Sequence, residues 1–350
     1  MSRKILKLFI KICLAMVVPA FLMGWTYCID PLQFYRVADW YMPRFYPQER
    51  YQNPAIARTH EYDMVIVGTS MSENISLDKL KKQYGVNAIR QTFAGSSVYE
   101  QRMGLEVAIG TGQVKKVIWE LNFTSFGGEI DKPKDSKMIF PEYLYNKNPL
   151  DDVKYLLDPV QMGRAWQIYR NPLPYSESVV NYEHEILNKW ENWFQYGEEY
   201  VLADFAEMRA KGELDVTEKI SKRFAWEKIY DNLQVNIFDI VGKNPNIEFT
   251  FYLAPFSVLE HVAYKMQGIF DEEMKFRAVC FYQLSRLANT KLFDFQGDKE
   301  VVENLNYYKD KMHYNRAITN NILWTVMTFE GTPEEQFEEN QVYLRTCVQK

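Results

Sequence analysis

The chain has few cysteines. Four occur among its 350 residues, and they are too scattered to form a disulfide framework or a zinc site: Cys13, Cys28, Cys280 and Cys347. A single bridge between Cys280 and Cys347 is left open by the sequence. We therefore expect this protein to hold neither a metal nor another cofactor.

The chain also lacks an excess of positive charge. It carries 41 lysines and arginines against 46 aspartates and glutamates, which gives a net charge of −5. Four of the cations lie at the N-terminus, so the rest of the chain is more acidic still: Arg3, Lys4, Lys7 and Lys11. This balance excludes the basic footprint that nucleic-acid binding requires, and we expect no nucleic-acid partner.

One long stretch has no charged residue, namely residues 12–29. Its length is close to the ~20 residues that a membrane-spanning helix needs, and spanning helices tolerate the Pro19 and Gly24 inside it. The preceding cations predict a single-pass membrane anchor with a cytoplasmic N-terminus and everything later extracytoplasmic. A cleaved signal peptide is the alternative, but bulky residues after the run leave no clear small-residue cleavage site.

The sequence divides into five segments by composition. Residues 1–11 are a basic cytoplasmic segment, residues 12–29 the anchor, and residues 30–61 a proline-bearing linker or N-terminal arm. Residues 62–329 form the expected globular domain, and residues 330–350 a C-terminal tail. Within the domain, residues 130–245 are rich in charge, Tyr and Trp. We interpret them as a largely helical insertion, with helices over 183–193 and 218–241, of the kind that forms a lid or a partner surface.

The rest of the domain alternates short apolar runs with amphipathic segments. This alternation predicts an α/β fold with a parallel sheet. We expect strands at residues 64–67, 88–93, 117–121, 247–253 and 291–295. Helices are expected at residues 76–84, 99–109, 271–288 and 314–329.

Two short stretches contain the candidate catalytic residues. Ser70 follows the first expected strand, and the carboxyl ends of strands in open α/β sheets are where ligands bind. A serine hydroxyl is a poor nucleophile until a base accepts its proton. Of the four histidines, only His313 has an acid three residues before it, Asp310. Asp310 can fix one ring nitrogen of His313 and leave the other for Ser70, so we expect Ser70, His313 and Asp310 to be catalytic.

These stretches resemble the first and last sequence blocks of the SGNH, or GDSL-like, hydrolase superfamily. The first block places a serine in Gly-x-Ser after strand one, here Gly68-Thr69-Ser70, with Thr69 where the family usually has aspartate. The last block is Asp-x-x-His, intact here as Asp310 and His313. The resemblance covers residues 62–125 and 245–325 and implies a flavodoxin-like three-layer α/β/α sandwich.

The two middle blocks are present in reduced form. Gly95 stands after the second expected strand, as the family's glycine does. Asn122 stands after the third, without the glycine and aspartate that usually accompany it. The resemblance implies that the backbone N–H groups of Ser70 and Gly95 and the side chain of Asn122 form an oxyanion hole.

The expected function is a membrane-anchored, extracytoplasmic SGNH-type serine esterase or acyltransferase. With its anchor, the chain is similar to the D-alanyl-lipoteichoic-acid transfer protein family and to polysaccharide O-acetylation proteins. That similarity implies an acylated glycan or another cell-envelope polymer as substrate. It also implies a membrane-bound O-acyltransferase as partner. The alternative is a catalytically weak or inactive SGNH-fold scaffold within a surface-polymer acylation complex.

Overall fold

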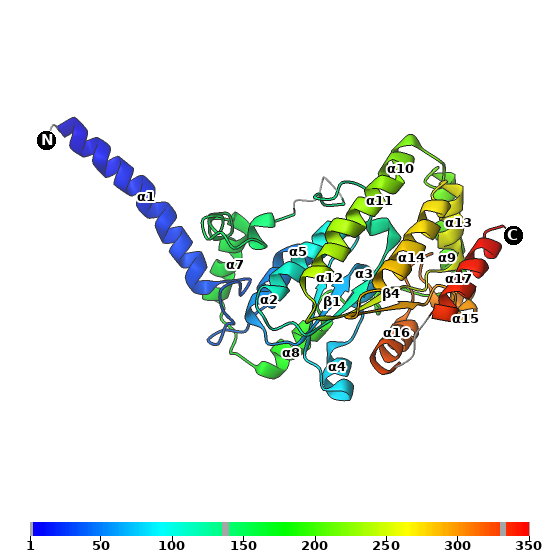
Figure 1. Cartoon of the computed structure of the whole chain (residues 1–350). Coiled ribbons are helices and arrows are strands. Elements are labelled where there is room, and N and C mark those ends of the chain that lie inside the picture. Colours follow the sequence, from blue (N-terminus) through cyan, green and yellow to red (C-terminus); the bar gives the residue numbers. More distant parts are fainter. Residues whose placement is uncertain (1–2, 135–139, 330–333, 350) are drawn as a thin grey trace. The chain divides into compact units, whose positions relative to one another are not determined.

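The computed structural model describes residues 3–134, 140–329 and 334–349 (Figure 1). The chain forms two compact units. The first comprises Met1–Glu61 and Phe140–Leu187, and the second comprises Tyr62–Ile139 and Asn188–Lys350. Residues 140–187 of the expected insertion thus belong to the first unit, and residues 188–245 to the second.

The first unit is helical. Its elements are α1 (Arg3–Ile29), α2 (Glu49–Thr59), the short 3-10 helix η2 (Glu142–Leu144), α6 (Val153–Leu156), α7 (Pro159–Arg170) and α8 (Glu177–Ile186). Residues 12–29 lie within α1. Among the residues that the structure describes, no helix has both the length and the apolar character needed to cross a membrane, so the expected spanning helix is not found.

A buried acid fixes the chain where α1 ends. Asp30 has a positive φ of 51°, and its carboxylate accepts hydrogen bonds from the backbone N–H of Phe34 at 2.9 Å and of Tyr35 at 2.8 Å. The hydroxyl of Tyr155 in α6 donates to the same carboxylate at 2.8 Å. These bonds satisfy an acid that is 2% exposed and join the segment after α1 to α6 within the first unit.

The second unit is built on a five-stranded parallel sheet. Its strands are β1 (Met64–Gly68), β2 (Ala88–Thr92), β3 (Lys116–Glu120), β4 (Glu248–Leu253) and β5 (Thr290–Asp294). Their order across the sheet is β2-β1-β3-β4-β5, and every neighbouring pair is parallel. All five lie within a residue or two of the apolar runs that predicted them, which confirms the α/β class. This order is one of the two common arrangements of doubly wound α/β proteins, which bind ligands where the strand order reverses, here between β1 and β3.

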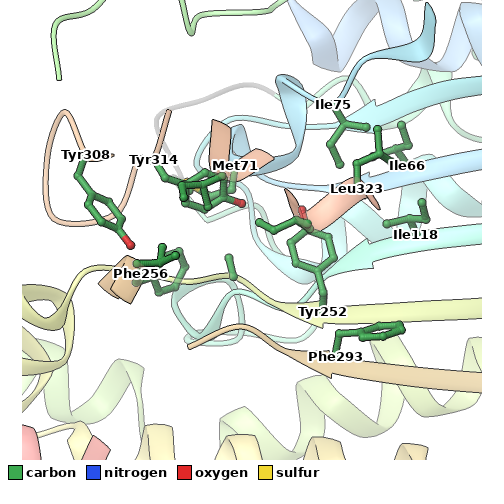
Figure 2. Close-up of a cluster of buried hydrophobic side chains, with 14 of the residues drawn as sticks. Ile66, Met71, Ile75, Ile118, Tyr252, Phe256, Phe293, Tyr308, Tyr314 and Leu323 are labelled. Atoms are coloured by element: carbon green, nitrogen blue, oxygen red, sulfur yellow. The ribbon is translucent and has the colours of Figure 1, made fainter. Parts of the chain in front are cut away.

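One face of the sheet packs on α4 (Leu77–Tyr84) and α16 (Arg316–Thr328). Alternate strand residues point into this layer because side chains along a strand alternate between faces. Figure 2 shows Ile66, Ile118, Tyr252 and Phe293 from four strands beside Leu323 of α16. Their burial supplies much of the hydrophobic stabilisation of this face.

The other face packs on α5 (Val98–Ile109) and α14 (Phe270–Leu284). Trp119 of β3 is fully buried, and its indole N–H donates to the side-chain oxygen of Gln101 in α5 at 2.8 Å. Arg277 of α14 pairs with Asp294 of β5 at 2.6 Å. The sheet therefore carries helices on both faces, and the carboxyl ends of its strands stay available for a site.

Several expected helices end or break earlier than the sequence indicated. The helix expected over 183–193 is wrong in its second half, because α8 ends at Ile186 and Asn188 adopts a positive φ of 59°. The helix expected over 218–241 is interrupted, because residues 224 and 225 leave helical geometry. It consists of α10 (Glu218–Arg223), α11 (Trp226–Leu233), the π-helical turn η3 (Gln234–Phe238) and α12 (Asp239–Lys243).

The remaining elements of the second unit connect these layers. They are α3 (Ser70–Glu73), η1 (Phe123–Ser125), α9 (Glu198–Ala210), α13 (Val258–Met266), α15 (Lys299–Val302), η4 (Leu305–Tyr307) and α17 (Glu334–Cys347). Cys280 and Cys347 are not joined by a disulfide, so the bridge that the sequence left open does not form.

Candidate active site

Ser70 lies in the turn that leaves the carboxyl end of β1. Gly68 ends the strand, Thr69 caps α3 by accepting from the backbone N–H of Met71, and Ser70 is the first residue of that helix. A side chain at Gly68 would have its Cβ 2.4 Å from the Ser72 hydroxyl and 2.7 Å from the Glu120 carboxylate. The turn therefore requires glycine at this position for close packing.

Asp310 and His313 lie in the loop between η4 and α16. An antiparallel bridge between Tyr308 and Tyr314 closes the base of this loop, and the backbone N–H of Lys309 donates to the carbonyl of His313 at 3.0 Å. The hydroxyl of Ser257 donates to the carbonyl of Lys311 at 2.8 Å. These bonds hold the Asp310–His313 loop at a fixed place beyond the sheet.

The structure brings Ser70, His313 and Asp310 together. The Ser70 hydroxyl lies 2.8 Å from Nε2 of His313. Nδ1 of the same ring lies 2.8 Å and 2.9 Å from the two carboxylate oxygens of Asp310. This geometry suits a histidine that donates from Nδ1 and accepts the serine proton at Nε2.

Asp310 is held as a carboxylate by several donors. One of its oxygens accepts from the backbone N–H groups of Met312 and His313, each at 2.9 Å, and the Lys309 ammonium lies 3.2 Å from the other. Partial burial acts to raise the pKa of Asp310, but the His313 hydrogen bond and the charges of His313 and Lys309 outweigh it. The pKa of Asp310 consequently lies well below its usual range.

The expected oxyanion donors lie at the ends of adjacent strands. Gly95 follows β2. The pairing of β2 with β1 ends at the hydrogen bond from the Phe93 N–H to the Gly68 carbonyl, which is 3.0 Å long. Gly95 has a φ of +60°, which favours glycine, and its surface faces open space. Within the described ranges, neither the Ser70 N–H nor the Gly95 N–H has a hydrogen-bond acceptor.

Asn122 is oriented by the start of η1. Its side-chain oxygen accepts from the backbone N–H of Thr124 at 3.0 Å and from the Thr124 hydroxyl at 2.9 Å. Burial raises the pKa of Glu120, and the side chain of Asn122 is one of the groups that act to lower it. Because the amide oxygen is occupied by Thr124, the N–H groups of the amide are the part of Asn122 that can donate to an oxyanion.

Trp190 is a site residue that sequence reasoning missed. Its indole N–H donates to the carbonyl of Ser70 at 2.8 Å, and its ring meets that of His313 edge to face, with centroids 5.1 Å apart. The ammonium of Lys309 lies 5.1 Å from the centre of the Trp190 ring. Trp190 was placed in an expected helix, and no local pattern signals a contact with residues 120 positions away.

The other serines near the turn have structural partners. Ser72 is fully buried and bonded to Glu120 and Tyr252. Ser96 accepts from Gln101, and Ser97 caps α5 in a capping box. No group of acidic, cysteine or histidine side chains in the part of the chain that the structure describes could hold a metal ion.

Comparisons with known proteins give little further constraint. No family model matches the chain, and no curated protein matches it. Among solved structures, the chain is similar to a protein from Streptococcus pneumonia that is provisionally described as a platelet activating factor, with 10% identity and a TM-score of 0.42. The match covers 80% of this chain and 91% of that chain, and at this level it carries no functional argument.

Proposed function

We propose that this protein is a serine ester hydrolase or acyltransferase that works through an acyl-enzyme on Ser70. The observation that carries the proposal is the continuous hydrogen-bonded path from the Ser70 hydroxyl through His313 to Asp310, with contacts of 2.8 Å on each side of the imidazole. A serine gains nucleophilicity only when a base is placed in this way.

The reaction follows from the positions of these groups. The Ser70 oxygen attacks the ester carbonyl while Nε2 of His313 takes its proton, and the carbonyl oxygen becomes an oxyanion. The N–H groups of Ser70 and Gly95 and the amide of Asn122 stabilise that charge. His313 then returns the proton to the departing alcohol, which leaves an acyl group on Ser70. Water or an acceptor hydroxyl, deprotonated by His313, removes the acyl group and restores the serine.

The substrate class belongs to the same proposal. The four sequence blocks resemble the SGNH superfamily with its flavodoxin-like sandwich, and the strand order supports that assignment. By the same resemblance, we propose acyl esters of cell-envelope glycans or polymers as substrates and a membrane-bound O-acyltransferase as partner. We also propose a membrane location with the domain outside the cytoplasm. Fractionation of cells, followed by protease accessibility of residues 62–329, tests that location.

A serine-directed fluorophosphonate probe tests the catalytic assignment. Wild type should be labelled at Ser70, and Ser70→Ala should lose the label because the nucleophilic oxygen is gone. Ser221→Ala is the matched control, because Ser221 lies exposed in α10, and it should be labelled like wild type. Equal labelling of Ser70→Ala and wild type would sink the proposal and leave the scaffold alternative.

A further inference from the structure

A carboxylate without a cation is buried directly behind the Ser70 turn. Glu120 ends β3 and is 0% exposed. Within the described ranges no ion pair includes Glu120, and the Lys134 ammonium interacts with it only through charge. A buried, unpaired carboxylate is costly unless hydrogen bonds compensate for the lost water. The hydrogen bonds that Glu120 accepts therefore indicate which groups it positions.

Those bonds reach both sides of the nucleophile. The backbone N–H of Thr69 donates to Glu120 at 2.8 Å, and the Thr69 hydroxyl donates at 2.9 Å. The Ser72 hydroxyl donates at 3.2 Å. Thr69 immediately precedes Ser70, and Ser72 follows it by two positions. One carboxylate thus fixes the turn on either side of Ser70.

The same carboxylate reaches the third oxyanion donor. Asn122 stands two residues after Glu120, and its side chain acts to lower the pKa of the carboxylate. The Asn122 oxygen already accepts from Thr124, so the N–H groups of the amide are the part of Asn122 that can face Glu120. The carboxylate that holds the Ser70 turn is therefore next to the expected oxyanion amide.

The network continues toward the loop that carries the base. The Ser72 hydroxyl lies 2.8 Å from the Tyr252 hydroxyl, and Tyr314 acts to lower the pKa of Tyr252. Tyr314 directly follows His313 in sequence, and both tyrosines belong to the buried cluster shown in Figure 2. The turn that Glu120 holds is thus packed, through Tyr252, against the start of the element that follows the base.

We propose that Glu120 is a positioning residue of this site, which holds the Ser70 turn, and with it the Ser70 N–H, in the geometry that oxyanion stabilisation needs. The inference rests on the proposed function, because it assigns Glu120 a role in the same reaction. A buried glutamate with no role beyond packing could be satisfied by hydrogen-bond donors anywhere around it. Glu120 instead accepts from one backbone N–H and two hydroxyl groups, and all three belong to the turn that carries Ser70.

Burial raises the pKa of Glu120, while the donors from Thr69, Ser72 and Asn122 oppose that rise. Replacement by methionine keeps the volume but removes both acceptor oxygens. The N–H of Thr69 and the hydroxyl of Ser72 then lose their acceptor, and the turn that carries the Ser70 N–H must shift. Because a lost oxyanion donor typically reduces kcat about 10²–10³-fold, a displaced donor should reduce it about 10–100-fold.

The test is a double-mutant cycle on kcat for a neutral ester such as p-nitrophenyl acetate. Glu120→Met, Thr69→Val and the double variant are compared with wild type, and rates are divided by the concentration of sites that the fluorophosphonate titrates. We expect each single variant to lose about 10–100-fold in kcat with little change in KM. The kcat of the double variant should be no lower than that of the less active single variant, because both changes break the same contact.

Controls separate positioning from simple loss of structure. Thr69→Ser retains the hydroxyl and should retain kcat. Glu248→Gln changes a glutamate with a 72% exposed side chain at the start of β4, and it should behave as wild type. Variants that differ from wild type only in thermal stability, with kcat per titrated site unchanged, would overturn the inference, as would losses that multiply in the double variant. Failure of wild type itself to label would instead overturn the proposed function, and this inference with it.

Discussion

Replacement of Asp310 by asparagine is the most demanding test of the site geometry. The carboxylate accepts the Nδ1–H of His313 at 2.8 Å and two backbone N–H groups at 2.9 Å. Asparagine retains only one oxygen, which the two backbone donors will occupy. Its NH2 group then faces Nδ1, so the imidazole must carry its proton on Nε2, where it can no longer accept the Ser70 proton.

The wrong tautomer should reduce kcat about 10⁴-fold, the loss seen for the same substitution in a serine protease triad. The fold should survive, because the lost charged hydrogen bond is worth about 1–3 kcal/mol. Initial rates of p-nitrophenyl acetate hydrolysis, together with thermal unfolding followed by circular dichroism, measure the two effects separately.

The same variant has a predictable pH dependence of stability. Asp310 has a lowered pKa in the folded protein, so its ionisation stabilises the fold above the pKa of the unfolded chain, about 3.9. That contribution is lost as the pH falls through the folded-state pKa. The difference in the free energy of unfolding between wild type and Asp310→Asn should therefore be largest above about pH 4. This difference should decrease as the pH is lowered further.

Asp204→Asn is the matched control for charge. Asp204 is half-buried and influences Asp310 electrostatically, but it makes no hydrogen bond with His313 among the described contacts. If Asp204→Asn loses as much activity as Asp310→Asn, or if Asp310→Asn keeps activity within tenfold of wild type, the tautomer argument is refuted.

Two further predictions concern the surroundings of Ser70. Gly68→Ala should destabilise the protein by about 1–3 kcal/mol in urea unfolding, because the added Cβ would lie 2.8 Å from the Cβ of Glu120. Gly242→Ala in helix α12 is the control: its added Cβ would have no atom within 4 Å, so the change should be neutral or stabilising. Trp190→Phe should lower kcat per titrated site about 2–10-fold, because the indole N–H to the Ser70 carbonyl is lost while an aromatic ring remains. Unchanged kcat in Trp190→Phe would show that this bond does not position the serine.

The strands and the Ser70–His313–Asp310 arrangement could be predicted from the sequence because both depend on local patterns. Apolar runs with breakers at each end locate buried strands, and parallel strands place their carboxyl ends at one edge. Ser70 and the Asp310–His313 pair each follow such a strand. A chain of this fold class therefore brings them to the same edge even though they are far apart in sequence.

The contributions of Trp190 and Glu120 could not be predicted in this way. The helix expected over 183–193 ends at Ile186, so Trp190 lies in a non-helical segment, and its contact with Ser70 joins residues 120 positions apart that no local periodicity connects. Glu120 gave a partial signal, since it is a charged residue at the end of an otherwise apolar buried strand. Its partners at Thr69 and Ser72 become visible only when β1 and β3 are paired.

The separation of 243 residues between Ser70 and His313 also bears on how the protein is made. Ribosomes add residues in order, at about 5–20 per second, so the serine is synthesised roughly 12–50 s before its base. During that interval the nascent chain contains β1 to β4 and Ser70, but not His313 or Asp310. The arrangement of Ser70, His313 and Asp310 on which the proposed function depends therefore forms only after the Asp310–His313 loop has been translated and docked.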